Sequence, residues 1–278
     1  MQLSTKTIGT MTEIDIEKIL VAKAPDLARK VPRFAINYLK RIVHEKDINH
    51  IISNYFELPP YEFIRSALGY MGVKYHATGL EKIDPNGRYL FASNHPFGGM
   101  DGVMLADLIS SHLGDVRVIV NDILMYVEPL RPIFIPVNKH GRQNQATAEA
   151  FNNAFNSDMP MLTFPAGLCS RRIKGKITDL EWKGNFIKKS IASERDIIPV
   201  HCEGRLSNFF YNLSNLRKTF GIKANVEMLY LVDEMFKQMG NDFNVTFGKP
   251  ISYKVLKDMP LREAVEYVRK ESYALAKE

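Results

Sequence analysis

Hydrophobic and polar positions recur at helical spacing through about the first seventy residues of the chain. Apolar side chains three and four positions apart predict a helix over residues 12–29. A second helix is expected over 32–46, since proline is well suited to the first turn of a helix. Residues 61–71, after a Pro-Pro pair, form a third. The helix over 32–46 has a basic and an apolar face, so it either packs on the core or contacts a membrane surface.

From residue 73 onward, short apolar runs alternate with longer helical windows. Strands are predicted over 73–75, 88–92, 116–120, 133–137, 161–164, 197–201, 226–231 and 244–247, and helices over 102–113, 145–156, 185–193, 209–220 and 261–276. Such alternation is typical of an α/β fold with a central, largely parallel sheet flanked by helices. We therefore expect a helical N-terminal extension, 1–72, packed on an α/β domain, 73–278.

The composition of the chain excludes several classes of protein. With 45% hydrophobic and 24% charged residues among 278, it can bury a core and is not disordered. Its two cysteines cannot build a disulfide framework, so a reducing compartment is expected. No apolar run reaches the ~20 residues of a transmembrane helix, and the N-terminus lacks the pattern of a signal peptide.

The net charge of +6 suits nucleic acid, an anionic membrane surface or phosphorylated substrates. A nucleic-acid-binding protein would carry a recognisable motif or interleaved aromatic and basic residues. The chain has neither, so no nucleic-acid partner is expected.

The most informative segment follows the predicted strand over 88–92, where the chain continues through His95 and a glycine pair to Asp101. Loops at strand ends often hold catalytic groups. Gly98 and Gly99 permit positive φ, so the chain can curl back and bring Asp101 to His95. The carboxylate would then fix one imidazole nitrogen and leave the other as a general base. Alternatively, His95 caps the turn and Asp101 caps the next helix.

Residues 94–102 (NHPFGGMDG) resemble the first motif of the glycerolphosphate and lysophospholipid acyltransferase superfamily, in which His and Asp stand at the end of a strand. Three later segments resemble the family's other motifs, in the family's order: 134–139 (FIPVNK), 164–171 (FPAGLCSR) and 197–200 (IIPV). By these four motifs, which span about residues 79–204, the chain is identified as a member of the superfamily.

Two departures from the family pattern narrow the resemblance. Five residues instead of four separate His95 from Asp101, and Ala166 stands where the family usually has the Glu associated with a glycerol-phosphate acceptor. Both departures resemble a bacterial hemolysin-like subgroup that includes O-acyltransferases of ornithine and glycine lipids. There, the hydroxyl of an amide-linked 3-hydroxy fatty acid receives the second acyl chain.

The resemblance implies acyl transfer from a thioester of acyl-carrier protein or coenzyme A to a lyso-lipid, with no bound cofactor. His95 would deprotonate the acceptor hydroxyl, and Asp101 would orient the imidazole. N–H groups of the Gly98-Gly99 turn, or of the start of the following helix, would hold the oxyanion. The chain lacks a Gly-x-Ser-x-Gly elbow, so direct transfer is expected. A membrane acceptor implies a peripheral protein on anionic lipid at the cytoplasmic side of the inner membrane.

Substrate binding is assigned to motif residues and to basic residues that follow two of the motif strands. Arginine binds phosphate or carboxylate through paired hydrogen bonds, so the basic residues suit the donor phosphate or the acceptor head group. The other interpretation of these residues is solvated loop charge. The expected set is Asn94, Lys139, Arg142, Phe164, Pro165, Gly167, Ser170 and Arg171.

Two other functions stay open on the sequence: a 1-acylglycerol-3-phosphate acyltransferase, and a non-catalytic lipid- or acyl-carrier-binding module. The presence of both His95 and Asp101 favours an enzyme. Cys169, His201 and Cys202 make an incomplete ligand set, so no metal site is expected.

Overall fold

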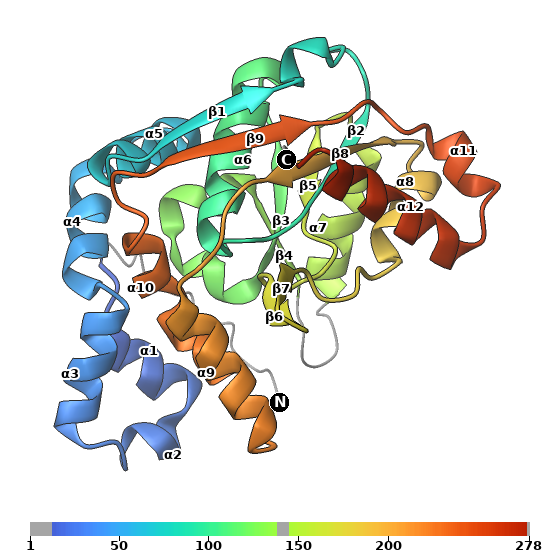
Figure 1. The fold of residues 1–278 in the computed structure, drawn as a ribbon. Coiled ribbons are helices and arrows are strands. Elements are labelled where there is room, and N and C mark those ends of the chain that lie inside the picture. The colour runs from blue at the N-terminus through green and yellow to red at the C-terminus, as the bar shows by residue number, and fades with distance from the viewer. Residues whose placement is uncertain (1–12, 138–144, 277–278) are drawn as a thin grey trace, which may run out of the picture.

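The computed structural model describes residues 13–137 and 145–276. At its centre is a seven-stranded sheet of β1 (Lys74–Thr78), β2 (Tyr89–Ser93), β3 (Arg117–Asn121), β4 (Phe134–Val137), β5 (Met161–Thr163), β8 (Asp196–Cys202) and β9 (Asp242–Phe247). The strand order is β1-β9-β8-β2-β5-β3-β4 (Figure 1). Among the described strands of this sheet, only β8 and β9 pair antiparallel, so the predicted, largely parallel sheet is confirmed.

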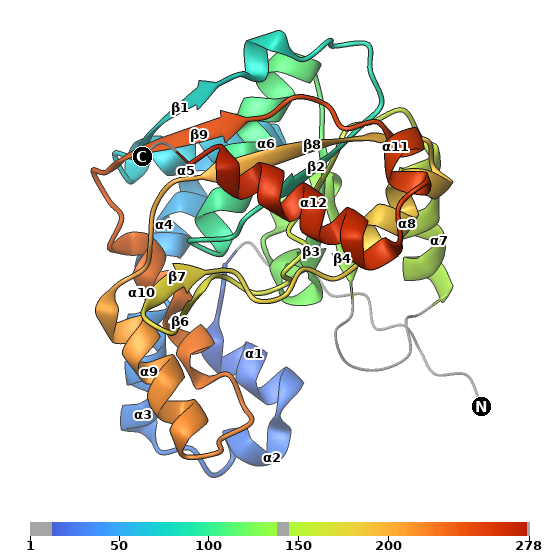
Figure 2. The same cartoon turned by 45° about the vertical axis from the view of Figure 1, so that its right-hand side comes forward.

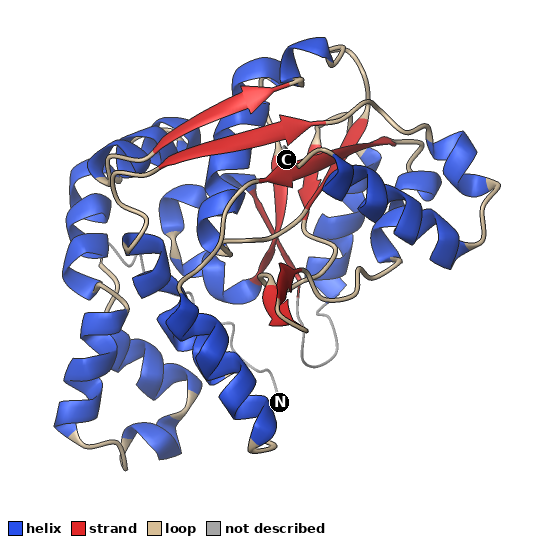
Figure 3. Cartoon of the chain, viewed as in Figure 1, coloured by secondary structure: helices blue, strands red, loops and turns tan. Residues whose placement is uncertain are grey.

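Helices cover both faces of this sheet, as Figure 3 shows. On one face, α4 (Glu45–Tyr55), α5 (Pro60–Tyr70) and α6 (Gly99–Leu113) contribute to one hydrophobic cluster. On the other, α7 (Gln145–Asn156), α8 (Asn185–Ala192) and α12 (Leu261–Ala274) contribute to a second. Strand β2 contributes side chains to both clusters, with Phe91 in the first and Leu90 and Ala92 in the second. This alternation follows from the two-residue period of a strand.

The remaining helices extend the molecule beyond the sheet. The first three, α1 (Ile16–Lys23), α2 (Pro25–Ala28) and α3 (Arg33–Ile42), lie near α9 (Asn208–Thr219) in both views (Figures 1 and 2). The short α10 (Leu231–Phe236) packs on α6, and α11 (Tyr253–Lys257) packs on α8. Among the helices that the structure describes, none combines the length and apolar character needed to cross a bilayer.

Two predicted helices are each divided in the structure. The helix expected over 12–29 breaks before Pro25, where the residue ahead of a proline is pushed out of the helical region. The helix expected over 32–46 ends at Ile42, and α4 starts after His44, which has φ of 51°. Helix α6 begins three residues earlier than predicted, so Asp101 lies in its first turn.

The strand predicted over 226–231 is wrong. This segment forms the 3₁₀ helix η4 (Val226–Tyr230), which continues into α10. Its apolar run contains Glu227, which is buried against two arginines, while Leu229 is 52% exposed. A side-chain pattern of this kind cannot give a strand one buried face. The small antiparallel hairpin of β6 (Arg171–Ile173) and β7 (Lys176–Thr178) was not predicted.

Strands β5, β2 and β8 are parallel neighbours, so their carboxyl ends meet at one edge of the sheet. In open α/β sheets, ligands bind beyond this edge. The first motif follows β2 and the third follows β5, so both lie at this edge.

Candidate active site

His95 and Asp101 meet at the end of β2. His95 follows the strand by two residues, and its Nδ1 lies 3.0 Å from Oδ1 of Asp101. Asp101 is fully buried, whereas the His95 side chain is 16% exposed. The ring N–H is not aligned for a regular hydrogen bond, a looseness common in active sites before substrate binds. The chain therefore does curl back and bring the imidazole to the carboxylate.

The Asp101 carboxylate is fixed by backbone donors. Its Oδ2 accepts a hydrogen bond from the N–H of Phe97 at 3.0 Å, and its Oδ1 accepts one from the N–H of Gly102 at 3.0 Å. The residue also lies in the first turn of α6, where the positive end of the helix dipole stabilises an anion. The Asp101 carboxylate is thus held in place beside His95.

Gly98 gives the loop between His95 and Asp101 the sharp turn that its fifth residue requires. This glycine has φ of 77°, and a Cβ there would lie 2.8 Å from Cδ2 of Leu231 in α10. Only glycine combines this backbone conformation with so close a contact. Because α6 starts at the next residue, the five-residue step still brings Asp101 under His95.

The third motif forms a wall beside the imidazole. Phe164, just after β5, stacks on the His95 ring with centroids 4.0 Å apart and planes 26° apart. A tight turn follows, in which the N–H of Gly167 donates to the Phe164 carbonyl at 2.9 Å. The Pro165 carbonyl accepts from the N–H of Lys183 at 3.1 Å. Phe164 thus lies against His95, and Pro165 and Gly167 form the turn that follows it; their expected role in substrate binding stays a prediction.

Asn94 and Ser170 are buried and bonded to the protein itself. The Asn94 amide accepts from the N–H of Cys202 at 2.7 Å and donates to its carbonyl at 2.9 Å. It thus joins the ends of β2 and β8. Ser170 donates its N–H to the His95 carbonyl at 2.7 Å. Both residues hold the site loops in place, which differs from the direct substrate contact expected of them.

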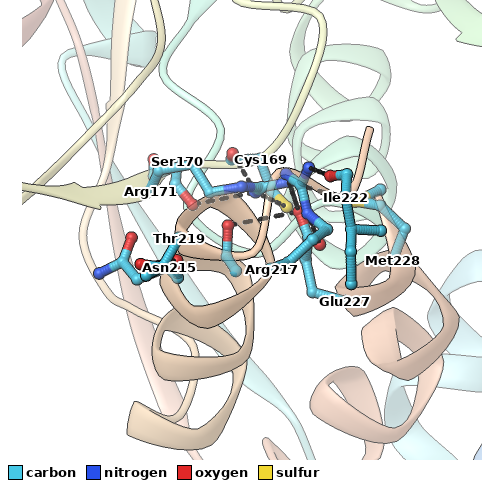
Figure 4. Close-up of polar contacts among 10 residues, drawn as sticks. Cys169, Ser170, Arg171, Asn215, Arg217, Thr219, Ile222, Glu227 and Met228 are labelled. Carbon is cyan, nitrogen blue, oxygen red and sulfur yellow. Dashed lines mark hydrogen bonds and ion pairs between the residues drawn. The ribbon is translucent and has the colours of Figure 1, made fainter. Parts of the chain in front are cut away.

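Arg171 also departs from expectation, because its side chain is only 2% exposed. It lies beside Glu227 and Arg217 in the group of polar contacts that Figure 4 shows. Its Nη2 lies 3.1 Å from Oε1 of Glu227, and its Nη1 donates to the Cys169 carbonyl at 2.6 Å. Arg217 pairs with the same carboxylate at 2.8 Å. Burial raises the pKa of Glu227, but hydrogen bonds, chiefly from Arg217, and the charges of both arginines outweigh it, so the pKa falls below its usual value. Arg171 is thus committed to a buried network that joins β6 to α9 and η4.

Of the three remaining positions singled out in the sequence, the structure describes Ala166, whereas Lys139 and Arg142 lie outside the described residues. Ala166 is 4% exposed and belongs to the hydrophobic cluster that contains Trp182 and Phe186, so a charged side chain could not be accommodated there without rearrangement.

A second buried carboxylate lies at this site and was not predicted from the sequence. Asp179 follows β7 and is 2% exposed. Its Oδ1 accepts from the N–H of His95 at 3.2 Å and from the Ser170 hydroxyl at 2.6 Å. It stands 84 positions from His95, outside every motif, so no local signal marks it.

Comparisons with known proteins show the family of this chain. A family model described as acyltransferase matches residues 18–278. Lyso-glycine lipid O-acyltransferases of Bacteroides thetaiotaomicron and Phocaeicola vulgatus are each 44% identical to this chain. The first alignment covers 94% of this chain and 97% of the relative, and the second covers 90% and 91%. The crystal structure of a 1-acyl-sn-glycerophosphate acyltransferase from Thermotoga maritima has a TM-score of 0.50 over 87% of each chain. At 15% identity, that likeness concerns the fold alone. Since the family model and both relatives span nearly its whole length, this chain belongs to the acyltransferase family that its four motifs indicated.

Proposed function

We propose that this acyltransferase moves a fatty acyl group from an acyl thioester to the hydroxyl of a monoacylated aminoacyl lipid of the lyso-glycine type. The observation that carries this proposal is the 44% identity, over 94% of this chain, to a lyso-glycine lipid O-acyltransferase. Acyl-carrier protein and coenzyme A present the same thioester group, so the proposed chemical step is the same with either donor.

In the proposed mechanism, His95 is the general base. Asp101 lies against Nδ1, which leaves Nε2 to take the proton of the acceptor hydroxyl as its oxygen attacks the thioester carbonyl. Asp101 stabilises the imidazolium that forms. N–H groups at Gly98 and Gly99, at the start of α6, are suited to stabilise the tetrahedral oxyanion. When the carbon–sulfur bond breaks, the imidazolium returns its proton to the leaving thiolate.

The environment of the cysteines supports direct transfer over an acyl-cysteine intermediate. Cys169 and Cys202 are both free and buried. Burial raises the pKa of each thiol, which keeps it protonated and poorly nucleophilic. No other step of the mechanism requires them.

Ala166 supports an aminoacyl acceptor over a glycerol phosphate. Its methyl group offers neither charge nor a hydrogen bond where the family usually places Glu, and it is packed in an apolar cluster. Enzymes that recognise a substrate hydroxyl or charge through a polar contact discriminate strongly against substrates lacking it, and this contact is absent here.

We also propose that the protein works as a peripheral enzyme at the cytoplasmic face of an anionic membrane. Two large aromatic side chains are strongly exposed, Phe34 on α3 at 76% and Phe220 after α9 at 71%. Tyr38 and Phe209, from the same two helices, are each about half exposed, and Arg41 lies 5.3 Å over the Tyr38 ring. Apolar side chains beside cations suit an anionic lipid surface.

A competition experiment tests the acceptor. Lyso-glycine lipid and lysophosphatidic acid are offered at equal concentration in mixed vesicles, with one labelled acyl thioester, and both products are counted. We expect the diacylated glycine lipid to predominate. If phosphatidic acid is the main product, the enzyme is instead a 1-acylglycerol-3-phosphate acyltransferase.

A further inference from the structure

We propose that Asp179 is a positioning residue for His95, holding the backbone of the catalytic loop against the third motif. This inference rests on the proposed role of His95 as the general base. Asp179 does not touch the imidazole; its contacts are with the main chain that carries it.

The carboxylate of Asp179 receives three neutral donors. Oδ1 accepts from the N–H of His95 and the hydroxyl of Ser170, and Oδ2 accepts from the indole N–H of Trp182 at 2.9 Å. Its own backbone N–H donates to the hydroxyl of Tyr273 in α12 at 2.8 Å. Burying a carboxylate to 2% exposure costs free energy unless hydrogen-bond donors satisfy its oxygens. The three donors to Asp179 supply these hydrogen bonds.

Ser170 completes a clamp around His95. While its hydroxyl donates to Asp179, its backbone N–H donates to the carbonyl of His95 at 2.7 Å. The N–H of His95 is therefore bonded to Asp179 and its C=O to Ser170, and these two residues are bonded to each other. The position of the His95 Cα, from which the imidazole projects, is fixed by Asp179 and Ser170 together.

Asp101 and Asp179 thus divide the task of placing the general base. Asp101 lies against the ring nitrogen, and Asp179 holds the peptide. A shift of about 1 Å in a reacting group can cost about a hundredfold in rate, because catalysis depends on near-attack geometry. Loss of the Asp179 contacts should therefore lower turnover without altering how tightly the acceptor binds.

The substitution Asp179→Asn tests this role. An Asn side chain has one acceptor oxygen and one NH₂ group, so its NH₂ must oppose either the Trp182 N–H or the donors from His95 and Ser170. We expect kcat to fall about 10- to 100-fold, with the acceptor KM within about twofold of wild type. Trp182 is the only tryptophan of the chain, so its fluorescence reports whether the local contact has changed.

Asp107→Asn is the matched control. Asp107 is likewise a buried carboxylate, 5% exposed, and accepts from the hydroxyl of Tyr75 at 2.7 Å. We expect this variant to lose a similar amount of thermal stability and to keep its kcat. If Asp107→Asn loses kcat as much as Asp179→Asn does, or if Asp179→Asn stays within about threefold of wild type, the positioning role is overturned.

Should Asp179→Asn not fold, Ser170→Ala decides the question. This substitution removes the hydroxyl that donates to Asp179, and it does not remove or add a charged side chain. A kcat at least about threefold lower, at unchanged KM, supports the clamp, and an unchanged kcat overturns it. Every variant is assayed with whichever acceptor, lyso-glycine lipid or lysophosphatidic acid, the wild-type enzyme acylates. The result for Asp179 is thereby separated from the identity of the acceptor.

Discussion

Replacing Asp101 by Asn removes one negative charge from the contact with His95 while preserving the shape of the side chain. In the structure, one carboxylate oxygen accepts from Phe97, and the other accepts from Gly102 and faces the His95 ring. The amide of Asn can accept on one side only. If its NH₂ turns toward His95, it favours the imidazole tautomer whose Nε2 carries the proton, and this tautomer cannot act as a base.

The size of the effect follows from the 3.0 Å separation of Nδ1 and Oδ1. Two unit charges at that distance attract by about 5.5 kcal/mol at an effective dielectric constant of about 20. This energy corresponds to about four powers of ten in rate if it acts fully in the transition state. Solvent screens part of it, because the His95 side chain is 16% exposed. We therefore expect kcat to fall by about 10²- to 10⁴-fold, the usual range for a lost general base.

The assay is the initial rate of thiol release from an acyl thioester at saturating acceptor, for folded, purified protein. A matched control is available on the surface, where Asp242 lies 3.0 Å from His76 and both side chains are more than half exposed. We expect Asp242→Asn to retain the wild-type kcat. If Asp101→Asn keeps more than about a tenth of the wild-type rate, the pairing of His95 with Asp101 is not what drives catalysis.

Three further predictions concern the loop, the buried network and acid stability. Gly98→Ala places a Cβ at a position with φ of 77°, and this atom would lie 2.8 Å from Cδ2 of Leu231. We therefore expect a loss of about 1–2 kcal/mol in unfolding free energy and at least a tenfold loss of activity. Gly114→Ala, with φ of 85° but open space around it, should keep full activity; equal losses would refute the role of the contact. Glu227→Gln leaves buried arginines unpaired and should cost about 3–5 kcal/mol in urea unfolding, a prediction that an unchanged midpoint would contradict. Burial lowers the pKa of His201 below 6.5, so the unfolded chain binds this proton first, and stability should decline as the pH falls through and below that value. His201→Asn should flatten the decline, and an identical pH dependence in both proteins would exclude His201 as its source.

Much of the fold was predictable because its signals are local. The apolar runs of β2, β3, β5 and β8 are short and bounded by polar or glycine residues, and this pattern alone indicates buried strands in a parallel sheet. The His95–Asp101 contact was predictable for the same reason, since a strand end, a glycine pair and a helix start all lie within ten residues.

The features that were missed depend on partners far away in the chain. The sequence pattern of the apolar run at Val226 is that of a strand. In the structure Glu227 of this run pairs with Arg171, which lies 56 positions earlier, and sequence spacing does not show that pair. Because of this pairing, Arg171 is buried in the structure, although the sequence predicted that it contacts substrate. Asp179 was overlooked because its role comes only from its contacts with the His95 and Ser170 loops.

We propose that this chain is an aminoacyl-lipid O-acyltransferase and that His95 is its general base. The most direct measurement incubates purified wild-type and His95→Ala proteins with lyso-glycine lipid and an isotope-labelled acyl thioester, and identifies the product by mass spectrometry. We predict that the wild-type protein places the labelled chain in an ester on the hydroxyl of the amide-linked fatty acid, and that His95→Ala forms this product at least about a hundredfold more slowly. Absence of this ester with the wild-type protein would contradict the proposed acceptor, and more than about a tenth of the wild-type rate in correctly folded His95→Ala would contradict the role of His95.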